Sequence, residues 1–168
     1  RRVLFRSTAK GMVAEKRPFQ GILYAGLIQT ATGPKVIEFN ARFGDPETQV
    51  VLARLESPLS EIISSLLVKE QPTIAWNELA SVGVVVAAEG YPNQYKTNLP
   101  LPEMSGETIY YAGVTRSEQA LVSAGGRIFL AEATASTLEE ARKKVYQTLD
   151  NYSFPGMYYR KDIGVKIG

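Results

Sequence analysis

The segment VIEFNARFGDPETQ (residues 36–49) most constrains how this chain can fold. It reads as a strand followed at once by a turn that contains Arg, Gly, Asp and Pro. Alternate side chains of an extended strand share a face. Ile37 and Phe39 would then face a hydrophobic core, while Glu38 and Asn40 would point the other way, about 7 Å apart at roughly 3.3 Å per residue. The pattern predicts a strand that is buried on one face and carries two oxygen donors on the other.

The segments on both sides of this strand predict a hairpin and a helix. GILYAGLIQT (residues 21–30) has the composition of a strand and is joined to the strand at 35–40 by turn residues at 31–34, so we expect an antiparallel hairpin. Asp45 then suits the N-cap of a helix, because its carboxylate can accept a backbone N–H from the first turn. Pro46 would occupy the first helical position, where its missing N–H costs nothing.

The rest of the chain predicts one long helix and several shorter elements. Ser136 and Glu139 form a capping box for the long helix at 136–152, whose apolar residues recur at helical spacing. Gly125-Gly126 suits a tight hairpin turn between the two strands that flank it. The other predicted elements are a helix at 59–68, a strand at 81–90, a loop at 91–106 and strands at 107–114, 119–124 and 127–135.

Composition shifts suggest how the chain is divided. Residues 1–7, RRVLFRS, do not join the pattern that follows, and the same string results from translating a common sequencing-adapter end. We therefore exclude them from the fold and expect the true chain to continue upstream. A polar stretch at 69–78 predicts a domain boundary near residue 71. We expect an α+β fold: antiparallel strands with helices in residues 8–70, then a small, mixed, β-rich domain with one long helix in residues 71–168.

The composition excludes several kinds of chemistry. The chain has no Cys and no His, which removes thiol nucleophiles, disulfides, cysteine metal sites and the commonest general base. The net charge of +2, from 19 Lys and Arg against 17 Asp and Glu, indicates no nucleic-acid or anionic membrane partner. No apolar run approaches the roughly 20 residues that span a bilayer, and no secretory signal is visible. We expect a cytoplasmic protein.

The turn and the strand before it gather groups that suit a phosphate-bound cation. A carboxylate and an amide carbonyl, from Glu38 and Asn40, favour Mg²⁺ over Zn²⁺, and Mg²⁺ usually fills its other positions with water and phosphate oxygens. The planar fork of Arg42 matches phosphate or carboxylate, Gly44 permits a tight backbone, and a helix start at Asp45 presents free N–H groups. Spacing alone, however, favours a structural explanation, in which Glu38 pairs with Arg42 and Asp45 caps its helix.

Several segments resemble one enzyme family. VIEFNARFGDPETQVVLARL (residues 36–55) resembles the signature of the glycinamide ribonucleotide synthetase family, the phosphoribosylamine–glycine ligases, in the ATP-grasp superfamily. The resemblance extends, in the same order, from residue 8 to the end, through PFQGILYAGLI, VVVAAEGYP, SAGGRIF and FPGMYYRKDIG. The family tends to have Lys-Gly where this chain has Lys96-Thr97, which weakens any transfer of roles in the loop at 91–106.

The resemblance implies a ligase of de novo purine biosynthesis. ATP would phosphorylate the carboxylate of glycine to glycyl phosphate, and the amine of 5-phosphoribosylamine would attack it to give glycinamide ribonucleotide, ADP and phosphate. Glu38 and Asn40 would then be Mg²⁺ or Mn²⁺ ligands at the nucleotide, and Arg42 would stabilise the transferring phosphoryl group. Gly44 and Asp45 would contact the substrate, although Asp45 could equally act only as a cap. Phosphoryl transfer depends on alignment and charge neutralisation, so the lack of His is no obstacle.

The resemblance also implies what the chain would need. The nucleotide-holding lysines, the glycine-rich loop and the N-terminal domain of the family would lie upstream of residue 8. We therefore expect this chain alone to bind ATP weakly and to be inactive, with the missing lobes of the same longer chain as its partner. Two alternatives stay open: another ATP-grasp carboxylate–amine ligase, and a non-catalytic module that pairs with a separate partner lobe.

Overall fold

The chain forms two compact units, defined by the contacts within each. A computed structural model describes residues 2–106, 108–118 and 120–165. We call Arg1–Gly44 together with Pro58–Thr73 the hairpin unit, and Asp45–Ser57 together with Ile74–Gly168 the sheet unit. The predicted domain boundary near residue 71 stays a prediction, because this division also assigns residues 45–57 to the sheet unit.

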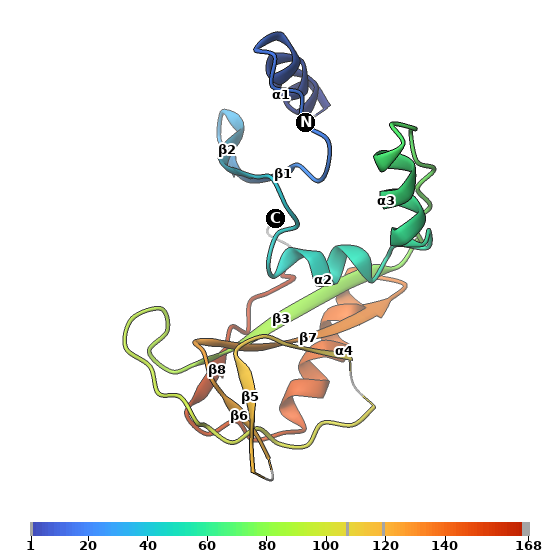
Figure 1. Ribbon diagram of the computed structural model, residues 1–168. Coiled ribbons are helices and arrows are strands. Elements are labelled where there is room, and N and C mark those ends of the chain that lie inside the picture. Colours follow the sequence, from blue (N-terminus) through green and yellow to red (C-terminus); the bar gives the residue numbers. More distant parts are fainter. Residues whose placement is uncertain (1, 107, 119, 166–168) are drawn as a thin grey trace. The chain divides into compact units, whose positions relative to one another are not determined.

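The hairpin unit is built on one antiparallel strand pair. Its elements are α1 (Arg2–Ala14), β1 (Tyr24–Thr30), β2 (Gly33–Asn40) and α3 (Leu59–Leu67) (Figure 1). The predicted hairpin and the predicted helix at 59–68 are therefore confirmed. At the turn, Gly33 has φ +101°, a conformation that glycine adopts without penalty, and the Thr30 hydroxyl donates to its carbonyl oxygen at 2.6 Å.

The prediction that Ile37 and Phe39 face a core is wrong for the hairpin unit. Ile37 is 66% exposed and Phe39 is 42% exposed. Among the described residues of this unit, Ile62 of α3 is the hydrophobic side chain that becomes buried. The alternation of β2 correctly separates the two sets of side chains, but nothing described within the unit covers the apolar one.

The sheet unit contains a four-stranded antiparallel sheet in the order β4-β7-β3-β8, and a separate two-stranded ribbon of β5 and β6. Helix α4 packs on β3 and β7, as Figure 1 shows. The elements are α2 (Glu47–Leu52), β3 (Ala80–Ala88), β4 (Thr108–Tyr111), β5 (Val114–Ser117), β6 (Ala120–Ser123), β7 (Arg127–Ala135), α4 (Leu138–Asp150) and β8 (Met157–Tyr159). The expected α+β class, with antiparallel strands, is confirmed.

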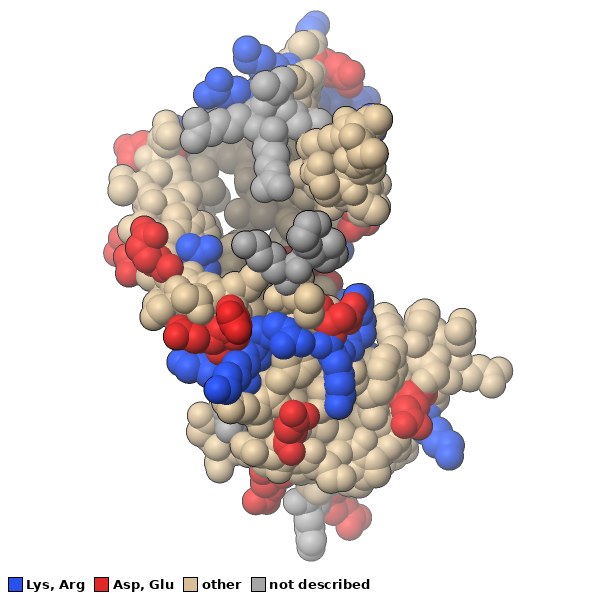
Figure 2. Space-filling model, turned by 180° about the vertical axis from the view of Figure 1, so that it is seen from behind, with Lys and Arg blue, Asp and Glu red and all other residues tan. Residues whose placement is uncertain are grey.

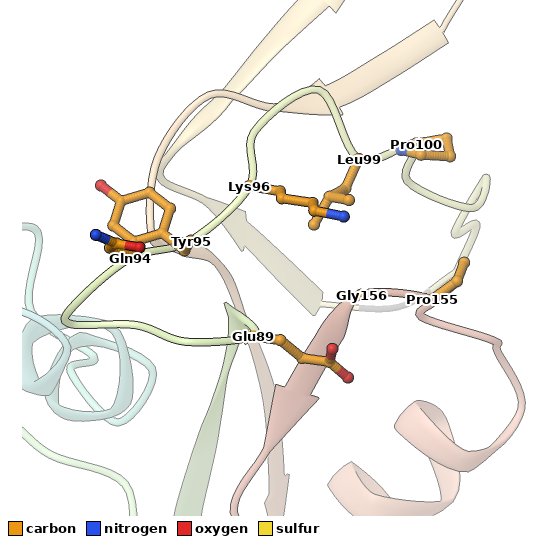
Figure 3. Close-up of a pocket in the computed structure, with 8 residues that line it drawn as sticks. All are labelled: Glu89, Gln94, Tyr95, Lys96, Leu99, Pro100, Pro155 and Gly156. Carbon is orange, nitrogen blue, oxygen red and sulfur yellow. The ribbon is translucent and has the colours of Figure 1, made fainter.

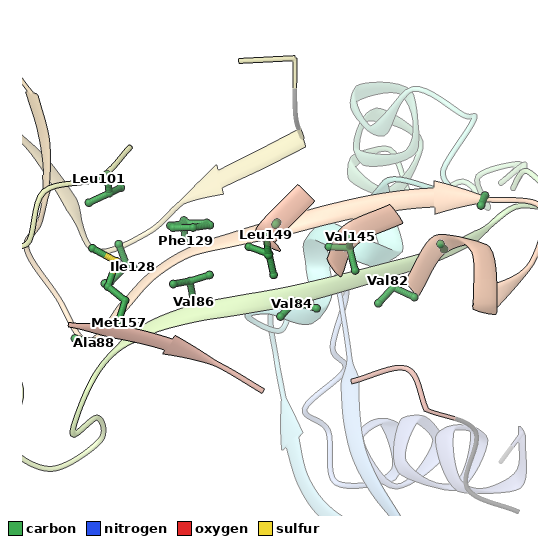
Figure 4. Close-up of a cluster of buried hydrophobic side chains, with 13 residues drawn as sticks. Val82, Val84, Val86, Ala88, Leu101, Ile128, Phe129, Val145, Leu149 and Met157 are labelled. Carbon is green, nitrogen blue, oxygen red and sulfur yellow. The ribbon is translucent and has the colours of Figure 1, made fainter. Parts of the chain in front are cut away.

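The core of the sheet unit joins α4 to the two central strands (Figure 4). Ala141, Val145 and Leu149 lie four residues apart on α4, so they share a helix face, and all three are fully buried. They pack in one cluster with the inward-facing valines of β3 and with Ile128 and Phe129 of β7. The helical period of residues 138–150 therefore places this helix on the sheet.

Two predicted details, the N-cap of the long helix and the hairpin turn at Gly125-Gly126, are wrong. The N-cap of α4 is Thr137 rather than Ser136, and its side chain accepts a hydrogen bond from the Glu140 backbone N–H at 3.2 Å. Gly125-Gly126 does not close a hairpin, because β6 pairs with β5 while β7 pairs with β3 and β4. These glycines instead permit close approach: a Cβ on Gly126 would lie 2.2 Å from the ring of Tyr91.

Three further observations concern the loop after β3, the helices and the surface charge. Residues 91–106, all of them described, contain no helix or strand beyond one isolated bridge of Pro100 with Val122, as predicted. Within the described ranges, no helix is both long and apolar enough to cross a lipid bilayer. Figure 2 shows Lys and Arg next to Asp and Glu rather than a surface of one sign.

Candidate functional site

Glu38 and Asn40 project from the same face of β2, at the end of the hairpin. The Asn40 Nδ2 donates to Glu38 Oε1 at 2.9 Å, so the two side chains point toward each other. Gly26 lies opposite Glu38 on β1, and a Cβ there would approach the Glu38 Cγ to 3.3 Å. The glycine thus leaves room for the carboxylate side chain. The sequence prediction had not singled out Gly26, because its role depends on the register of the hairpin.

Arg42 follows the strand but does not pair with Glu38. Its Nη1 donates to the carbonyl oxygen of Phe43 at 2.8 Å, and the side chain is otherwise exposed. Among the described residues, the structure records no ion pair between Glu38 and Arg42. Gly44 is buried at the end of this segment. The structural explanation of this stretch, which required a Glu38–Arg42 pair, therefore loses its main contact.

Asp45 belongs to the sheet unit and does not cap helix α2. The N-cap position is Pro46, with no side-chain hydrogen bond, and α2 extends only over Glu47–Leu52. The physical reason is that the Asp45 carboxylate has other partners. Arg127 Nη2 donates to Asp45 Oδ2 at 2.8 Å, and Gln49 Nε2 donates to Asp45 Oδ1 at 3.3 Å. The carboxylate is thus held by the side chains of Arg127 and Gln49.

The cavity beside Asp45 is small and is lined by partly buried side chains. Gln49, Tyr110, Arg127 and Phe129 line a cavity of about 10 Å³ beside it, too small for a substrate. Burial, together with the nearby Glu132 carboxylate, raises the pKa of the Tyr110 hydroxyl. A ligand of Asp45 would have to approach from its exposed side.

The donors on β2 fit a hard, oxygen-preferring cation. Among the described residues, no three His, Cys, Asp or Glu side chains gather into a cluster that could hold a metal by themselves. A pair of one carboxylate and one amide is enough for Mg²⁺ or Mn²⁺ when water and phosphate oxygens supply the other ligands. Asn40 donates its Nδ2 to Glu38, which leaves its Oδ1 as the atom that could face such an ion.

A larger cavity lies elsewhere in the sheet unit. It measures about 660 Å³ and is lined by Glu89 directly after β3, by the loop that follows and by the segment before β8. Figure 3 shows Glu89, Tyr95 and Lys96 among the side chains that line it. The sequence prediction left this loop without a role, because Lys96-Thr97 departs from the family pattern.

Comparison with known proteins identifies the family. The sequence model of the phosphoribosylglycinamide synthetase C domain matches residues 81–166, about half of the chain. The model of the ATP-grasp (A) domain of the same synthetase matches residues 1–48. The chain belongs to the phosphoribosylglycinamide synthetase family. The candidate residues Glu38, Asn40, Arg42, Gly44 and Asp45 lie within the ATP-grasp match.

Individual members of the phosphoribosylglycinamide synthetase family agree. The phosphoribosylamine–glycine ligase of Halalkalibacterium halodurans is 52% identical over 163 residues, 95% of this chain and 38% of that protein. The ligase of Lactococcus lactis subsp. lactis is 50% identical, over 95% of this chain and 39% of that protein. The chain therefore spans about two fifths of the length of these relatives.

A solved member of the family has the same fold. The crystal structure of phosphoribosylamine–glycine ligase from Thermotoga maritima matches with a TM-score of 0.80 and 30% sequence identity, over 91% of this chain and 39% of that chain. The predicted resemblance to the family, and the predicted fold class, are therefore confirmed.

Proposed function

We propose that this chain forms part of an ATP-dependent ligase that joins glycine to 5-phosphoribosylamine. The observation that carries the proposal is the pair of oxygen donors, Glu38 and Asn40, on one face of β2. The pair lies within the ATP-grasp match, and Asn40 precedes Arg42 by two residues. Membership of the family supports the same reaction, because the relatives in this family are named phosphoribosylamine–glycine ligases. The products would be glycinamide ribonucleotide, ADP and phosphate. We also propose that the protein is cytoplasmic, as expected from the sequence.

In this proposal, Glu38 and Asn40 hold a Mg²⁺ or Mn²⁺ ion. Such an ion would neutralise charge on the phosphate oxygens of ATP and align them for transfer. Glu38 supplies negative charge to the site, and Asn40 supplies a neutral oxygen while its amide nitrogen keeps the Glu38 carboxylate in place. Gly26 keeps the space beside Glu38 open.

Arg42 and Asp45 would act on the two substrates. The exposed guanidinium of Arg42 can bind the transferring phosphoryl group or the acyl phosphate of glycine, where its charge lowers the energy of the developing anion. Asp45, whose side chain is 52% exposed, can accept a hydrogen bond from the amine of phosphoribosylamine and so fix the direction of attack. Gly44 would let the backbone pass close to the substrate.

The proposal can be tested with a fusion protein. In it, this chain replaces the segment that it matches in the Halalkalibacterium halodurans relative, which supplies the remaining three fifths of the length. We expect release of phosphate that requires ATP, glycine and phosphoribosylamine together. A folded fusion protein without such activity would contradict the proposal. Activity with another acid or amine instead would favour the alternative ATP-grasp ligase, and activity of this chain alone would contradict the expected need for the missing lobes.

The metal-binding role of Glu38 has its own test. Glu38→Gln in the fusion protein removes one charge and keeps the size of the side chain. We expect at least about a 100-fold loss of ligase activity, because the cation would lose a charged protein ligand. We also expect weaker Mn²⁺ binding, measured by electron paramagnetic resonance with ADP present to supply phosphate oxygens. The control is Glu61→Gln on α3, an exposed glutamate of the same unit, which should change neither value. Equal Mn²⁺ binding in the two variants would contradict the role of Glu38.

A further inference from the structure

Arg127, at the start of β7, makes two hydrogen bonds to Asp45, 82 positions earlier in the sequence. Its Nη1 donates to the Asp45 backbone carbonyl oxygen at 2.9 Å, and its Nη2 donates to Asp45 Oδ2 at 2.8 Å. A planar guanidinium that binds both the main chain and the side chain of one residue fixes the direction of that side chain. Arg127 therefore restrains both the position of Asp45 and the direction of its carboxylate.

Gln49 restrains the second carboxylate oxygen from another element. Its Nε2, on α2, donates to Asp45 Oδ1 at 3.3 Å. The other end of this amide, Oε1, is buried and has no hydrogen-bond partner among the described residues, so the contact with Asp45 is the one that orients the group. Each carboxylate oxygen thus accepts a hydrogen bond from one of these two side chains, and because a carboxylate offers about four acceptor positions, it can accept a further hydrogen bond from a ligand.

The strength of an exposed ion pair argues that this arrangement does more than stabilise the fold. The side chains of Arg127 and Asp45 are 39% and 52% exposed. Ion pairs at such exposure contribute little to folding stability, because water screens them and two long side chains must be ordered. The two hydrogen bonds from Arg127 nevertheless favour one direction of the Asp45 carboxylate, and orientation is what a substrate-binding carboxylate needs.

We infer that Arg127 is a positioning residue that, with Gln49, holds the Asp45 carboxylate in the orientation that accepts the substrate amine. This inference rests on the proposed function. Arg127 lies in the C-domain match, residues 81–166. Asp45 lies in the ATP-grasp match, residues 1–48. Residues of the two matched segments would then build one binding group together.

The test is Arg127→Met in the fusion protein, which keeps the apolar stem and removes both donors. We expect the KM for phosphoribosylamine to rise about 10-fold, the KM values for ATP and glycine to stay within about twofold, and the unfolding temperature to change little. Arg127→Lys keeps the charge without the fork and should give an intermediate KM. Arg116→Met, which removes an exposed arginine of β5, is the matched control and should leave all KM values unchanged.

A double-mutant cycle separates positioning from a merely structural role. If Arg127 acts through Asp45, Arg127→Met should raise the KM about 10-fold in the wild-type background but less than about twofold in the Asp45→Asn background. An equal rise in both backgrounds would overturn the inference, as would an unchanged KM in Arg127→Met.

The remaining outcomes are also decisive. If Arg127→Met fails to fold, Gln49→Met replaces it, and we expect a rise of about threefold in the same KM; no rise would overturn the inference. Failure of the proposed function is recognised separately, because the fusion protein with wild-type residues would then show no phosphoribosylamine-dependent activity at all.

Discussion

Strand β3 in the sheet unit and strand β2 in the hairpin unit show two ways in which a strand can be used. The valines Val82, Val84 and Val86 of β3 are nearly or completely buried and pack against α4. In β2 the corresponding apolar side chains, Ile37 and Phe39, remain largely exposed. Both strands alternate in the same way, so the difference lies in what covers the apolar face.

This difference separates stability from the candidate chemistry. The sheet unit has a continuous core of buried side chains from β3, β7 and α4. The hairpin unit carries Glu38 and Asn40 on strand β2, and Arg42 two residues after its end, with little burial of this segment among the described residues. We therefore expect substitutions in the sheet unit to change mainly the free energy of unfolding. We expect substitutions at the end of β2 to change mainly activity and metal binding.

The largest expected effect is on the core of the sheet unit. Leu149→Ala should lower the free energy of unfolding by about 2–5 kcal/mol, because it removes a fully buried side chain and leaves a cavity against β3 and β7. Leu67→Ala, the same change at a position of α3 that is 77% exposed, should cost within about 0.5 kcal/mol. Urea denaturation followed by circular dichroism measures both. Equal costs would mean that α3 packs far more tightly than the exposure of Leu67 indicates.

Two glycines with similar backbone angles should respond differently to alanine. Gly90 has φ +90°, and a Cβ there would lie 2.0 Å from the backbone oxygen of Gln94. Gly33 has φ +101°, but a Cβ there would meet nothing within 4 Å. Gly33→Ala should cost about 1 kcal/mol from backbone strain alone, whereas Gly90→Ala should cost about 2–3 kcal/mol, because the clash is added to the strain.

The measurement for Gly90 uses the fluorescence of Trp76, the only tryptophan of the chain, which lies in the sheet unit. Gly33 belongs to the hairpin unit, so amide hydrogen exchange of β1 and β2 is the better measurement there. If the two substitutions cost the same, strain rather than the contact with Gln94 would dominate at both positions.

Tyr159 gives the sheet unit an expected sensitivity to alkaline pH. Burial, with a hydrogen bond from the hydroxyl to Asp150 Oδ1 at 2.7 Å, raises the pKa of Tyr159 to about 12. The ordinary value is about 10, so the folded state holds this proton more tightly than the unfolded state does. The resulting stabilisation is complete below pH of about 10 and is lost as the pH rises through about 12.

Removal of the Tyr159 hydroxyl tests this pH dependence. Tyr159→Phe should cost about 1 kcal/mol at neutral pH and should make the loss of stability between about pH 10 and 12 less steep. Tyr158→Phe is the neighbouring control: it removes a hydroxyl that donates to the Tyr91 carbonyl oxygen and leaves the Tyr159 contribution in place. Urea titrations across this pH range would contradict the assignment if Tyr159→Phe kept the full slope.

The accuracy of the sequence predictions follows the range of the interactions involved. The hairpin, the helix at 59–68, strand β7 and helix α4 depend on local periodicity and turn residues, and the sequence predicts them within a few residues. The shift of the N-cap from Ser136 to Thr137 is a local choice between two similar side chains. Local patterns do not determine which strands pair, so the predicted hairpin turn at Gly125-Gly126 is wrong.

The candidate site shows the same limit. Glu38, Asn40 and Arg42 lie close together in the sequence, so their motif could be recognised from the residues alone. The partner of Asp45 could not, because Arg127 lies 82 positions away and only the fold brings it there. A local explanation, an N-cap, was available for Asp45, and it was wrong because a stronger charged donor competes for the same carboxylate. The metal and substrate roles of these residues stay predictions.

The smallest expected effect tests the comparison of the two strands most directly. Ile37→Val on β2 and Ile128→Val on β7 each delete one methylene group from a β-branched side chain in a strand. Ile128 is fully buried, so its substitution should cost about 1 kcal/mol, while Ile37, exposed as it is, should lose almost nothing. Hydrogen exchange of the amides in β2 and β7 measures each change in its own unit. In the fusion protein, however, a cost at Ile37 that approaches the cost at Ile128 would mean that the added chain covers the apolar face of β2. The strand that carries Glu38 and Asn40 would then be stabilised by residues outside this chain, and the alternation of Ile37 and Phe39 would have its physical explanation.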